Sequence, residues 1–462
     1  MVDVLLGADL GTSGLKLVAL DAAGAVVAGA ERAYRVDRPA PGRAEIDVRT
    51  WRAAFDEALA AVAPGIAGAR VRGMGISGQM HGAVLVDDHG VALRPALLWP
   101  DQRAAGELAR WRDLSPAQRA ALGNPLVAGM TGPLLCWLAR HEPEAVGRAA
   151  AVLLPKDALR ATLLPGRGPA VTDRSDASAT LLWDVVADRW SQAAVGAAGI
   201  ARELLPAIRP SAEVIGAAFL PVGEVPVVVG GADTPLALLA AGALGTQINL
   251  GSGAQVLRSC GRPGGVPVPV PVVHTYADTA GGWYAMAALQ NGGSVWEWVR
   301  GVLGLSWADF LAAAASVPAG AAGVVFRPFL TGERGGVAGP DDRGGWTGLG
   351  NATTRADLAR AALEGVLFAI RAAVDLLGVP DSDPVVLTGG ATRSDLVVQV
   401  LADVLGRPVQ PLGLRSASAV GAAVLAGRGV GLAVEPQRSA GLLGEPRSDD
   451  GLAAARARWS AV

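Results

Sequence analysis

Short apolar runs alternate with longer segments of helical spacing along most of the chain. The short runs are typical of strands, and they predict strands at residues 4–6, 15–20, 71–76, 83–86, 225–230, 246–250, 255–259 and 385–388. The longer segments place apolar side chains three and four positions apart, which predicts helices at residues 51–63, 103–112, 116–122 and 355–377. This alternation of strands and helices predicts the α/β class.

The two halves of the chain share a weak internal similarity. Each half opens with a strand, a turn of glycine, serine or threonine, and a second strand. The length of 462 residues is sufficient for two or three domains. We therefore expect a domain boundary near Gly242, with domains at residues 1–242 and 243–462. Residues 264–273 alternate proline with valine, which predicts an extended surface segment.

Composition and charge exclude several classes of protein. Hydrophobic residues make up 51% of the chain and charged residues 18%, which is too apolar for a disordered protein. The net charge is −2 and no block of like charge occurs, so we expect no nucleic acid and no membrane surface as a partner. The chain opens without a basic signal-peptide region, so we expect a cytoplasmic protein.

Residues 225–244 are apolar enough to resemble a membrane span, but they include Asp233. A charge in the middle of a span costs about 2.5–3.5 kcal/mol, so we expect buried protein core around a functional acid. Cys136 and Cys260 lie far apart, which excludes a disulfide framework. The four histidines are scattered, which argues against a zinc site.

The first candidate site is the turn Gly11-Thr12-Ser13, which follows Asp9 and precedes Lys16. Its backbone N–H groups and two hydroxyls suit phosphate oxygens, and Asp9 is placed to hold a Mg²⁺ through water. The Gly-Lys-Ser/Thr element of a Walker A loop is missing. An ordinary hairpin turn accounts for this pattern equally well.

Two further turns repeat this design. Gly251 and Ser252 lie between two predicted strands, and alone they fit a plain hairpin better than a phosphate site. Gly389 and Gly390 follow a predicted strand and precede a helix, a common arrangement at nucleotides. Ser394, just beyond them, fits better as a helix cap when it is taken alone.

Asp233 is a lone carboxylate in an apolar segment, and its burial is costly unless it is hydrogen-bonded or paired. Such a group is able to accept a proton from a substrate hydroxyl during phosphoryl transfer. The sequence Asp-Thr-Pro also fits a helix cap, which is the better interpretation without context. Both roles are compatible.

Polar side chains also follow two other predicted strands. Met80 and His81 come just after the strand at 71–76, at the end where α/β proteins bind ligands, although a polar turn is slightly favoured. Asp101 and Arg103 follow Trp99, and together they are able to grip a polyol. Alone, Asp101 is better interpreted as a helix cap.

Taken together, these segments resemble the FGGY carbohydrate kinases, and among them the xylulokinases. The resemblance runs from about residue 3 to about residue 428 and keeps the family order. It rests on residues 9–16, 75–82, 98–103, 153–157, 172–173, 175–177, 233, 332–334, 389–390 and 419–423. The Gln-Met-His-Gly element at 79–82 points towards xylulose within the family.

The resemblance implies two actin-like, ribonuclease H-like domains with a cleft between them. It implies an ATP-dependent ketose kinase that uses Mg²⁺, converts D-xylulose to D-xylulose 5-phosphate and forms a homodimer. Asp233 takes the position of the catalytic base, and Asp9 takes that of the metal-associated carboxylate. The remaining site residues are Gly11, Thr12, Ser13, Lys16, Gly251, Ser252, Gly389, Gly390 and Ser394 for ATP, and Met80, His81, Asp101, Arg103 and Asp233 for the sugar.

Several positions depart from the xylulokinase pattern. Pro100 and Thr234 each stand where asparagine is usual, so two amide donors near the sugar are lost. Leu134, Gly335-Gly336 and the second phosphate turn also differ. A kinase for another ketose or polyol, such as ribulose or an L-sugar, therefore stays open, as does a non-catalytic sugar sensor. An actin-like ATPase ranks last, because the elements at 79–82 and 99–103 have no role there.

Overall fold

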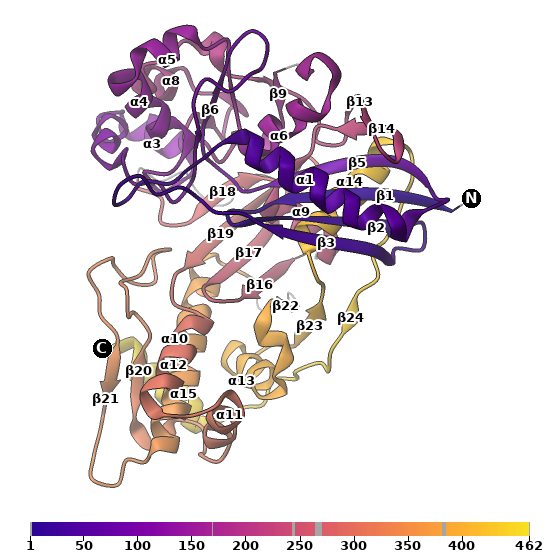
Figure 1. Ribbon diagram of the computed structural model, residues 1–462. Coiled ribbons are helices and arrows are strands. Elements are labelled where there is room, and N and C mark those ends of the chain that lie inside the picture. Colours follow the sequence, from indigo (N-terminus) through magenta and orange to yellow (C-terminus); the bar gives the residue numbers. More distant parts are fainter. Residues whose placement is uncertain (1, 169, 243–244, 264–269, 381–384, 462) are drawn as a thin grey trace.

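The computed structural model describes residues 2–168, 170–242, 245–263, 270–380 and 385–461, and it contains two large mixed sheets (Figure 1). The first sheet has the order β13-β14-β5-β1-β2-β3, and β15 also pairs with β5. Its strands are β1 (Asp3–Leu10), β2 (Gly14–Asp21), β3 (Val26–Ala33), β5 (Arg70–Gly78), β13 (Val214–Leu220), β14 (Gly223–Val228) and β15 (Gly231–Ala232). Strand β5 runs parallel to β1, while β1, β2 and β3 form an antiparallel meander.

Alternation along β1 divides the first sheet into two apolar faces. Leu6 and its neighbours two positions away pack with Trp51 and Phe55 of α1 (Val48–Val62). Leu5 faces the other way and packs with α9 (Asp233–Ala241) and α14 (Ala417–Gly429). Asp9 is an even number of residues from Leu5, so it lies on the face that α9 and α14 cover.

The first half carries additional short strands and helices, which gather above the main sheet in Figure 1. The short strands pair as β4 (Glu45–Ile46) with β7 (Ala96–Leu97), β6 (Val84–Val86) with β8 (Ala151–Leu153), β9 (Val171–Thr172) with β12 (Ala207–Ile208), and β10 (Trp183–Asp184) with β11 (Arg189–Trp190). The helices are α2 (Ala109–Arg112), α3 (Pro116–Leu122), α4 (Thr131–His141), α5 (Pro143–Arg148), α6 (Pro155–Leu163), α7 (Arg174–Ala177) and α8 (Gln192–Ala198).

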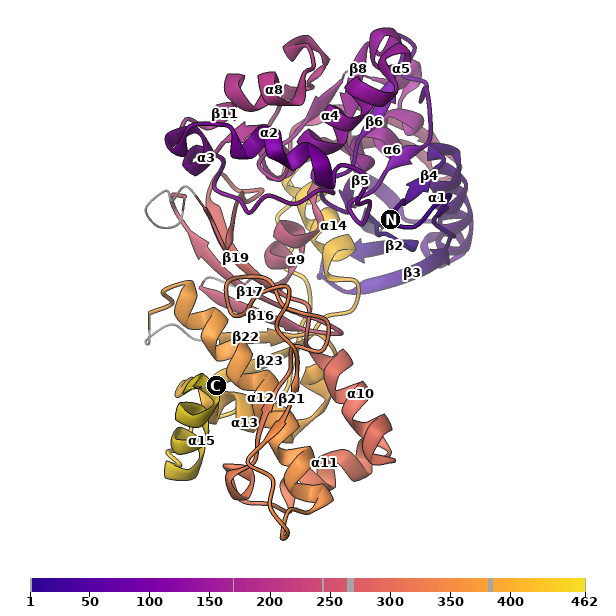
Figure 2. The same cartoon turned by 90° about the vertical axis from the view of Figure 1, so that its left-hand side faces the viewer.

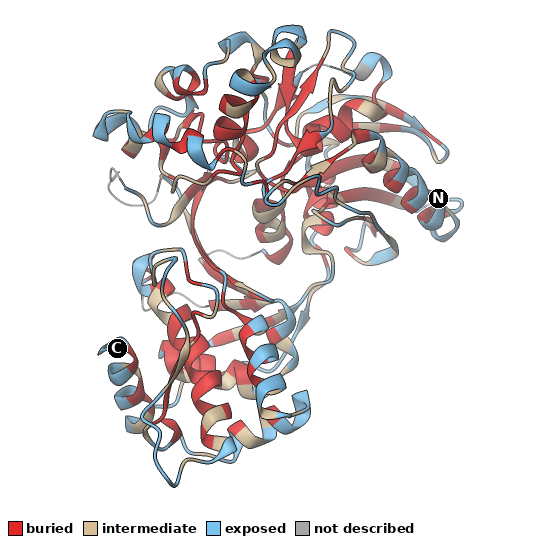
Figure 3. Ribbon diagram, turned by 60° about the vertical axis from the view of Figure 1, so that its left-hand side comes forward, coloured by how far each residue is buried: buried red, intermediate tan, exposed pale blue. Residues whose placement is uncertain are grey.

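The second sheet has the order β18-β19-β17-β16-β22-β23-β24. One of its faces packs with α10, α12 and α13 around a core that is buried throughout (Figure 3). The elements of this half are β16 (Thr246–Leu250), β17 (Ala254–Cys260), β18 (His274–Ala277), β19 (Trp283–Leu289), β20 (Val325–Arg327), β21 (Gly345–Thr347), β22 (Val385–Thr388), β23 (Val409–Gly413), β24 (Ser439–Ala440), α10 (Gly293–Leu303), α11 (Trp307–Ala315), α12 (Arg355–Leu376), α13 (Asp395–Leu405) and α15 (Asp450–Ala461).

Helix α14 comes late in the chain but packs against the first sheet, beside α9 (Figure 2). A Cβ on Gly7 would lie 1.9 Å from the Ala419 carbonyl oxygen, and one on Gly75 would lie 2.1 Å from that of Ala422. Only glycine permits this approach. The boundary near Gly242 stays a prediction. Residues 243–462 include α14, which packs against the first sheet.

The predicted strands and the helices at 51–63, 116–122 and 355–377 are confirmed, with ends shifted by a few residues at most. The predicted helix at 103–112 is shorter, because a 3-10 turn at Ala105–Leu108 precedes α2. The segment 225–242 forms β14, β15 and α9. No helix among the described residues has the length and hydropathy to cross a bilayer. The predicted extended segment at 264–273 falls mainly outside the described residues.

Candidate active site

Asp9 lies near the carboxyl end of β1, in a row of polar residues across the first sheet. It is opposite Ser77 of β5 on one side and Lys16 of β2 on the other, and Glu31 of β3 follows Lys16. Ser77 Oγ donates a hydrogen bond to Asp9 Oδ1 (3.0 Å). Burial raises the pKa of Asp9, while Ser77 and the Lys16 cation oppose that rise. The carboxylate therefore gains from any cation placed beside it.

The first phosphate turn, residues 11–13, is held from several sides. The hydroxyl of Tyr34 and the side-chain amide of Gln79 both donate to the Gly11 carbonyl oxygen. Trp99 Nε1 donates to Thr12 Oγ1 (2.8 Å). These contacts connect the turn to the segments that follow β3, β5 and β7, so its shape is fixed by side chains far away in sequence.

Asp233 is the first residue of α9 and follows β15 directly. Its Oδ1 accepts hydrogen bonds from the backbone N (2.7 Å) and the hydroxyl (3.3 Å) of Thr234. The helix starts at Asp233 itself rather than near Pro235, and Ala232 occupies the cap position. The predicted cap is therefore only partly correct: the carboxylate does accept an N–H of the first helical turn.

Burial and the negative charge of Asp9 together raise the pKa of Asp233 to about 7. Gly231 pairs with Ser77, which in turn pairs with Asp9, so the pairing of three strands brings both carboxylates to one end of the sheet. A carboxylate with a pKa near neutrality suits general base chemistry. The structure therefore brings together the two acids that the sequence selected.

Met80 and His81 form a turn after β5. His81 has φ +67°, an unusual conformation for a residue with a side chain, and its Nδ1 donates to the Ala179 carbonyl oxygen. Burial lowers the pKa of His81 to about 4, so its imidazole is neutral near pH 7. With Nδ1–H donated to a carbonyl, Nε2 is an acceptor for a substrate hydroxyl.

Residues of the second half of the chain lie beside the Met80–His81 turn, and they were not predicted from the sequence. The ring of Tyr276 on β18 lies 6.4 Å from that of His81, and the Tyr276 hydroxyl forms a hydrogen bond with His274 Nδ1 (2.7 Å). Burial, then His81 and the Arg334 cation, lower the pKa of His274 to about 3. Burial raises the pKa of Tyr276, and the negative charge of Asp233 adds to that rise. Arg334 lies in a family motif, but no sequence signal marked β18.

The side chains of Asp101 and Arg103 bond to each other and to neighbouring protein groups. Asp101 is fully buried, and it accepts hydrogen bonds from the Ala44 backbone N (2.7 Å) and from the guanidinium and backbone N of Arg103. Arg103 also pairs with Glu45 (2.6 Å) and stacks over the ring of Trp137 (4.8 Å). A sugar contact by either residue stays a prediction, and the observed contacts are those of a loop support.

A cavity of about 680 Å³ lies in the second half, between the β16–β17 turn and the start of α13. Four predicted nucleotide residues line it, namely Gly251, Ser252, Gly390 and Ser394. Trp296, Trp307 and Leu311 add apolar surface. Ligand sites of this kind combine apolar walls with a few convergent polar groups. The cavity therefore combines apolar surface with the hydroxyls of Ser252 and Ser394.

The edges of this cavity are tightly constrained. Gly293 N at the start of α10 donates to the Gly251 carbonyl oxygen (2.8 Å), and the Ser294 hydroxyl donates to that of Ser252 (2.8 Å). Gly389 has φ +91°, and a Cβ there would lie 2.6 Å from a β16 carbonyl oxygen. Ser394 Oγ accepts from a backbone N of α13, so the predicted cap is confirmed.

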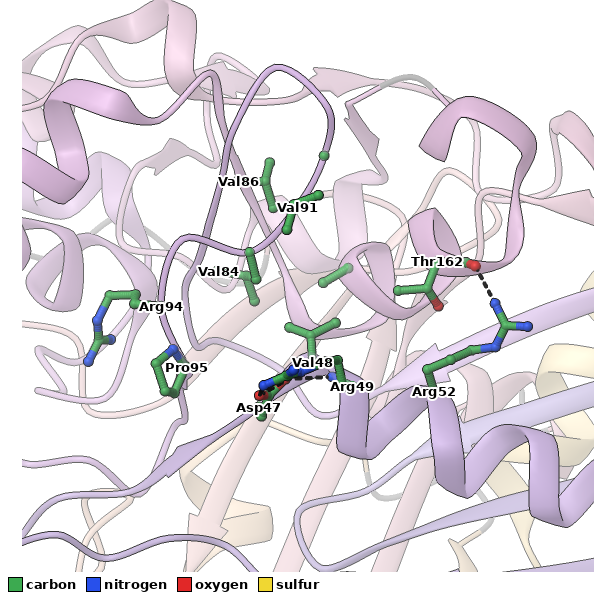
Figure 4. A pocket seen from close by; sticks show the side chains of 13 residues that line it. Asp47, Val48, Arg49, Arg52, Val84, Val86, Val91, Arg94, Pro95 and Thr162 are labelled. Atoms are coloured by element: carbon green, nitrogen blue, oxygen red, sulfur yellow. Dashed lines mark hydrogen bonds and ion pairs between the residues drawn. The ribbon is translucent and has the colours of Figure 1, made fainter.

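Another cavity of about 680 Å³ lies between α1 and β6 (Figure 4). Its apolar residues include Val48, Val84 and Val86, and the predicted site residues take no part in it. At its rim Arg49 pairs with the Asp47 carboxylate, while the Arg52 guanidinium bonds a carbonyl oxygen of α6. Because α1 covers the face of the sheet opposite to Asp9, this cavity is separate from the candidate active site.

Comparison with known proteins agrees with this arrangement. Residues 4–240 match the N-terminal domain of the FGGY family of carbohydrate kinases, and residues 248–430 match the C-terminal domain of that family. A xylulose kinase of Escherichia coli is 36% identical over 92% of this chain and 88% of its own length, and one of Klebsiella pneumoniae is 35% identical with the same coverage.

Solved structures give the same result. The structure titled as a "xyloylose kinase" from Brucella ovis superposes with a TM-score of 0.89 at 30% identity, covering 99% of this chain and 98% of that one. A xylulose kinase from Rhodospirillum rubrum gives a TM-score of 0.89 at 28% identity with the same coverage. The predicted α/β fold of two actin-like domains is confirmed, and the chain belongs to the FGGY family of carbohydrate kinases.

Proposed function

We propose that this carbohydrate kinase transfers the γ-phosphoryl group of ATP to the 5-hydroxyl of D-xylulose. The observation that carries the proposal is the placement of Asp233 and Asp9 together beside the Met80–His81 turn. A carboxylate whose pKa is raised to about 7 is a competent proton acceptor at physiological pH. The curated relatives with the printed name xylulose kinase support the choice of sugar.

The sugar lies between the two halves of the chain in this proposal. Met80 and His81 supply one wall, and Tyr276 and His274 supply the other. His81 Nε2 accepts a hydrogen bond from a sugar hydroxyl, because its Nδ1–H is already donated to a backbone carbonyl. Asp101 and Arg103 do not contact the sugar in this proposal, and their bonds to Ala44 and Glu45 hold the loop that carries Trp99.

The proton and the phosphoryl group move in opposite directions. Asp233 accepts the proton of the sugar hydroxyl while the hydroxyl oxygen forms a bond with the γ-phosphorus of ATP. The bond between the γ-phosphorus and the β,γ-bridging oxygen breaks, which releases ADP. Thr234 holds Asp233 Oδ1 through two hydrogen bonds, which orients the carboxylate. The proton then leaves Asp233 to solvent.

ATP occupies the cavity beside Gly251 and Gly390 in this proposal, with its phosphates directed towards the turn at 11–13 and Lys16. Mg²⁺ is commonly held by one or two carboxylates together with substrate phosphates, and Asp9 is the carboxylate placed for that role. Among the described residues no group of three metal-ligating side chains occurs, which agrees with a cation that is held partly by the nucleotide. When bound, Mg²⁺ neutralises charge on the β- and γ-phosphates.

A second candidate is a kinase for a different ketose or polyol. It is favoured by Thr234 and Pro100, which lack the amide donors that the xylulokinase pattern has at these positions. The hydroxyl of Thr234 is committed to Asp233 rather than to a sugar. A cytoplasmic location and a homodimer remain predictions that accompany either candidate.

The experiment is ADP release by purified protein with MgATP across pentuloses, hexuloses and polyols. We expect D-xylulose to give the highest kcat/KM, and Asp233→Asn to lower kcat by about 10²–10⁴-fold with ATP binding retained. Strong turnover with another sugar alone would transfer the specificity to that sugar. ATP binding without turnover on any sugar would support a sensor and reject the kinase.

A further inference from the structure

Five charged side chains form a fully buried cluster behind the candidate active site. Lys156 Nζ lies 2.7 Å from Asp157 Oδ1, 3.0 Å from Asp176 Oδ2 and 3.3 Å from Asp173 Oδ1. Arg160 lies 2.5 Å from the same oxygen of Asp157. Replacing a buried ion pair by packed apolar residues is often neutral or stabilising, so fold stability alone gives no reason for such a cluster.

One hydrogen-bond route leads from this cluster to the residue before Asp233. Asp173 contacts Lys156 through Oδ1, and its Oδ2 accepts a hydrogen bond from Ser175 Oγ (2.6 Å). Ser175 Oγ in turn accepts the backbone N–H of Ala232 (2.9 Å). Three contacts therefore connect the Lys156 ammonium to the backbone N–H of Ala232, the residue before Asp233.

Two more contacts connect the cluster to the same region. Arg160 donates to the Val229 carbonyl oxygen, at the end of the strand that leads to Asp233. A Cβ on Gly78 would lie 2.8 Å from Lys156 Cβ, and only one residue separates Gly78 from the Met80–His81 turn. The cluster thus supports the backbone on both sides of the proposed sugar site.

We propose that Ser175, anchored by the Lys156–Asp173 ion pair, is a positioning residue for the Asp233 carboxylate. This inference rests on the proposed role of Asp233 as the base. Displacement of a catalytic group by about 1 Å costs about 100-fold in rate, so a support one residue away controls turnover. Ser175 touches neither sugar nor nucleotide, and its effect on rate passes through Ala232.

Ser211 provides a matched control. Its Oγ donates to the same Asp173 Oδ2 (2.7 Å) and it is also buried, but its hydroxyl has no contact with Ala232. Ser175→Ala and Ser211→Ala therefore remove the same atom and the same contact to Asp173. Only Ser175→Ala removes the acceptor of the Ala232 N–H.

The experiment compares both variants with the wild type by steady-state kinetics, pH profile, thermal unfolding and amide hydrogen exchange. We expect similar losses of thermal stability. Ser175→Ala alone lowers kcat about 10- to 100-fold, with KM for ATP within about twofold of the wild type and faster exchange at Ala232. It also shifts the acid limb of the pH–kcat/KM profile, because the environment of Asp233 changes.

Equal kcat values and pH profiles for the two variants, at matched folded fraction, would overturn the inference. If Ser175→Ala does not fold, Ser175→Cys and Ser211→Cys give the same comparison, since the thiol fills the place of the hydroxyl and hydrogen-bonds only weakly. Asp233→Asn separates the two proposals. An inactive Asp233→Asn beside a fully active Ser175→Ala rejects only the positioning role, whereas an active Asp233→Asn rejects the base itself.

Discussion

Replacing Asp233 by asparagine is expected to stabilise the protein while it lowers kcat by about 10²–10⁴-fold. The carboxylate is partly buried and lies beside Asp9, and both the burial and the negative charge of Asp9 disfavour its charged form. An asparagine side chain has nearly the same shape and carries no charge, so this penalty disappears. The amide oxygen is still able to accept the hydrogen bonds that Thr234 donates to Oδ1.

The magnitude follows from the pKa of Asp233, which rises from 3.8 to about 7 on folding. At about 1.4 kcal/mol per pH unit, the shift corresponds to a ceiling of about 4 kcal/mol. Because solvent reaches part of the side chain, we expect a gain of about 1–2 kcal/mol. The native state binds the proton more tightly than the unfolded state, so the wild type loses stability as pH rises from about 4 to about 7. The variant lacks this loss.

Urea unfolding of the wild type and of Asp233→Asn at pH 5 and pH 8 measures the effect. The difference in free energy of unfolding should favour the variant, and it should be larger at pH 8 than at pH 5. Asp113→Asn serves as the control, because Asp113 is exposed and its replacement should change neither value. A variant that is less stable than the wild type at pH 8 would refute the reasoning.

Three other outcomes are expected. kcat/KM for the sugar should fall about tenfold per pH unit below about 7, because protonated Asp233 accepts no proton; a profile flat down to pH 5 would contradict this. Gly389→Ala should weaken ATP binding about 10- to 100-fold, because φ of residue 389 is +91° and the new Cβ lies 2.6 Å from a carbonyl oxygen of β16. Gly301→Ala should leave ATP binding unchanged, because a Cβ at residue 301 meets no other atom within 4 Å. Gly7→Ala should lower the free energy of unfolding by about 3 kcal/mol or more through a 1.9 Å contact with α14, and exposed Gly106→Ala should leave it unchanged.

Much of the sheet framework and of the chemistry was predictable from local sequence. The strands that flank the two phosphate turns have clear apolar patterns, and glycine with hydroxyl residues marks the turns between them. Asp233 was recognisable because a lone charge in an apolar segment needs a physical reason. Strand β3 was missed, since its residues are largely exposed and its alanine and glycine residues are not typical of a strand.

The remaining parts of the site depend on contacts between distant segments. His274 and Tyr276 reach the Met80–His81 turn because Asn124 binds the backbone of β18, a contact across about 150 residues of sequence. Asp101 and Arg103 have the residue types of a sugar site, but their groups bond to each other and to Glu45. Composition and spacing do not distinguish a free polar group from one with a buried partner.

Two elements of the second half, α14 and β18, are attached to the first half, which contains Asp233. Helix α14 packs on the first sheet through Gly7 and Gly75, and β18 is hydrogen-bonded to the first half at Gly123 and Asn124. Both elements belong to the second half in sequence, but they are attached to the first half in space. Closure of a kinase around its substrates brings the nucleotide to the acceptor and excludes water. We expect α14 and β18 to stay attached to the first half during such a movement, so that Tyr276 stays beside His81.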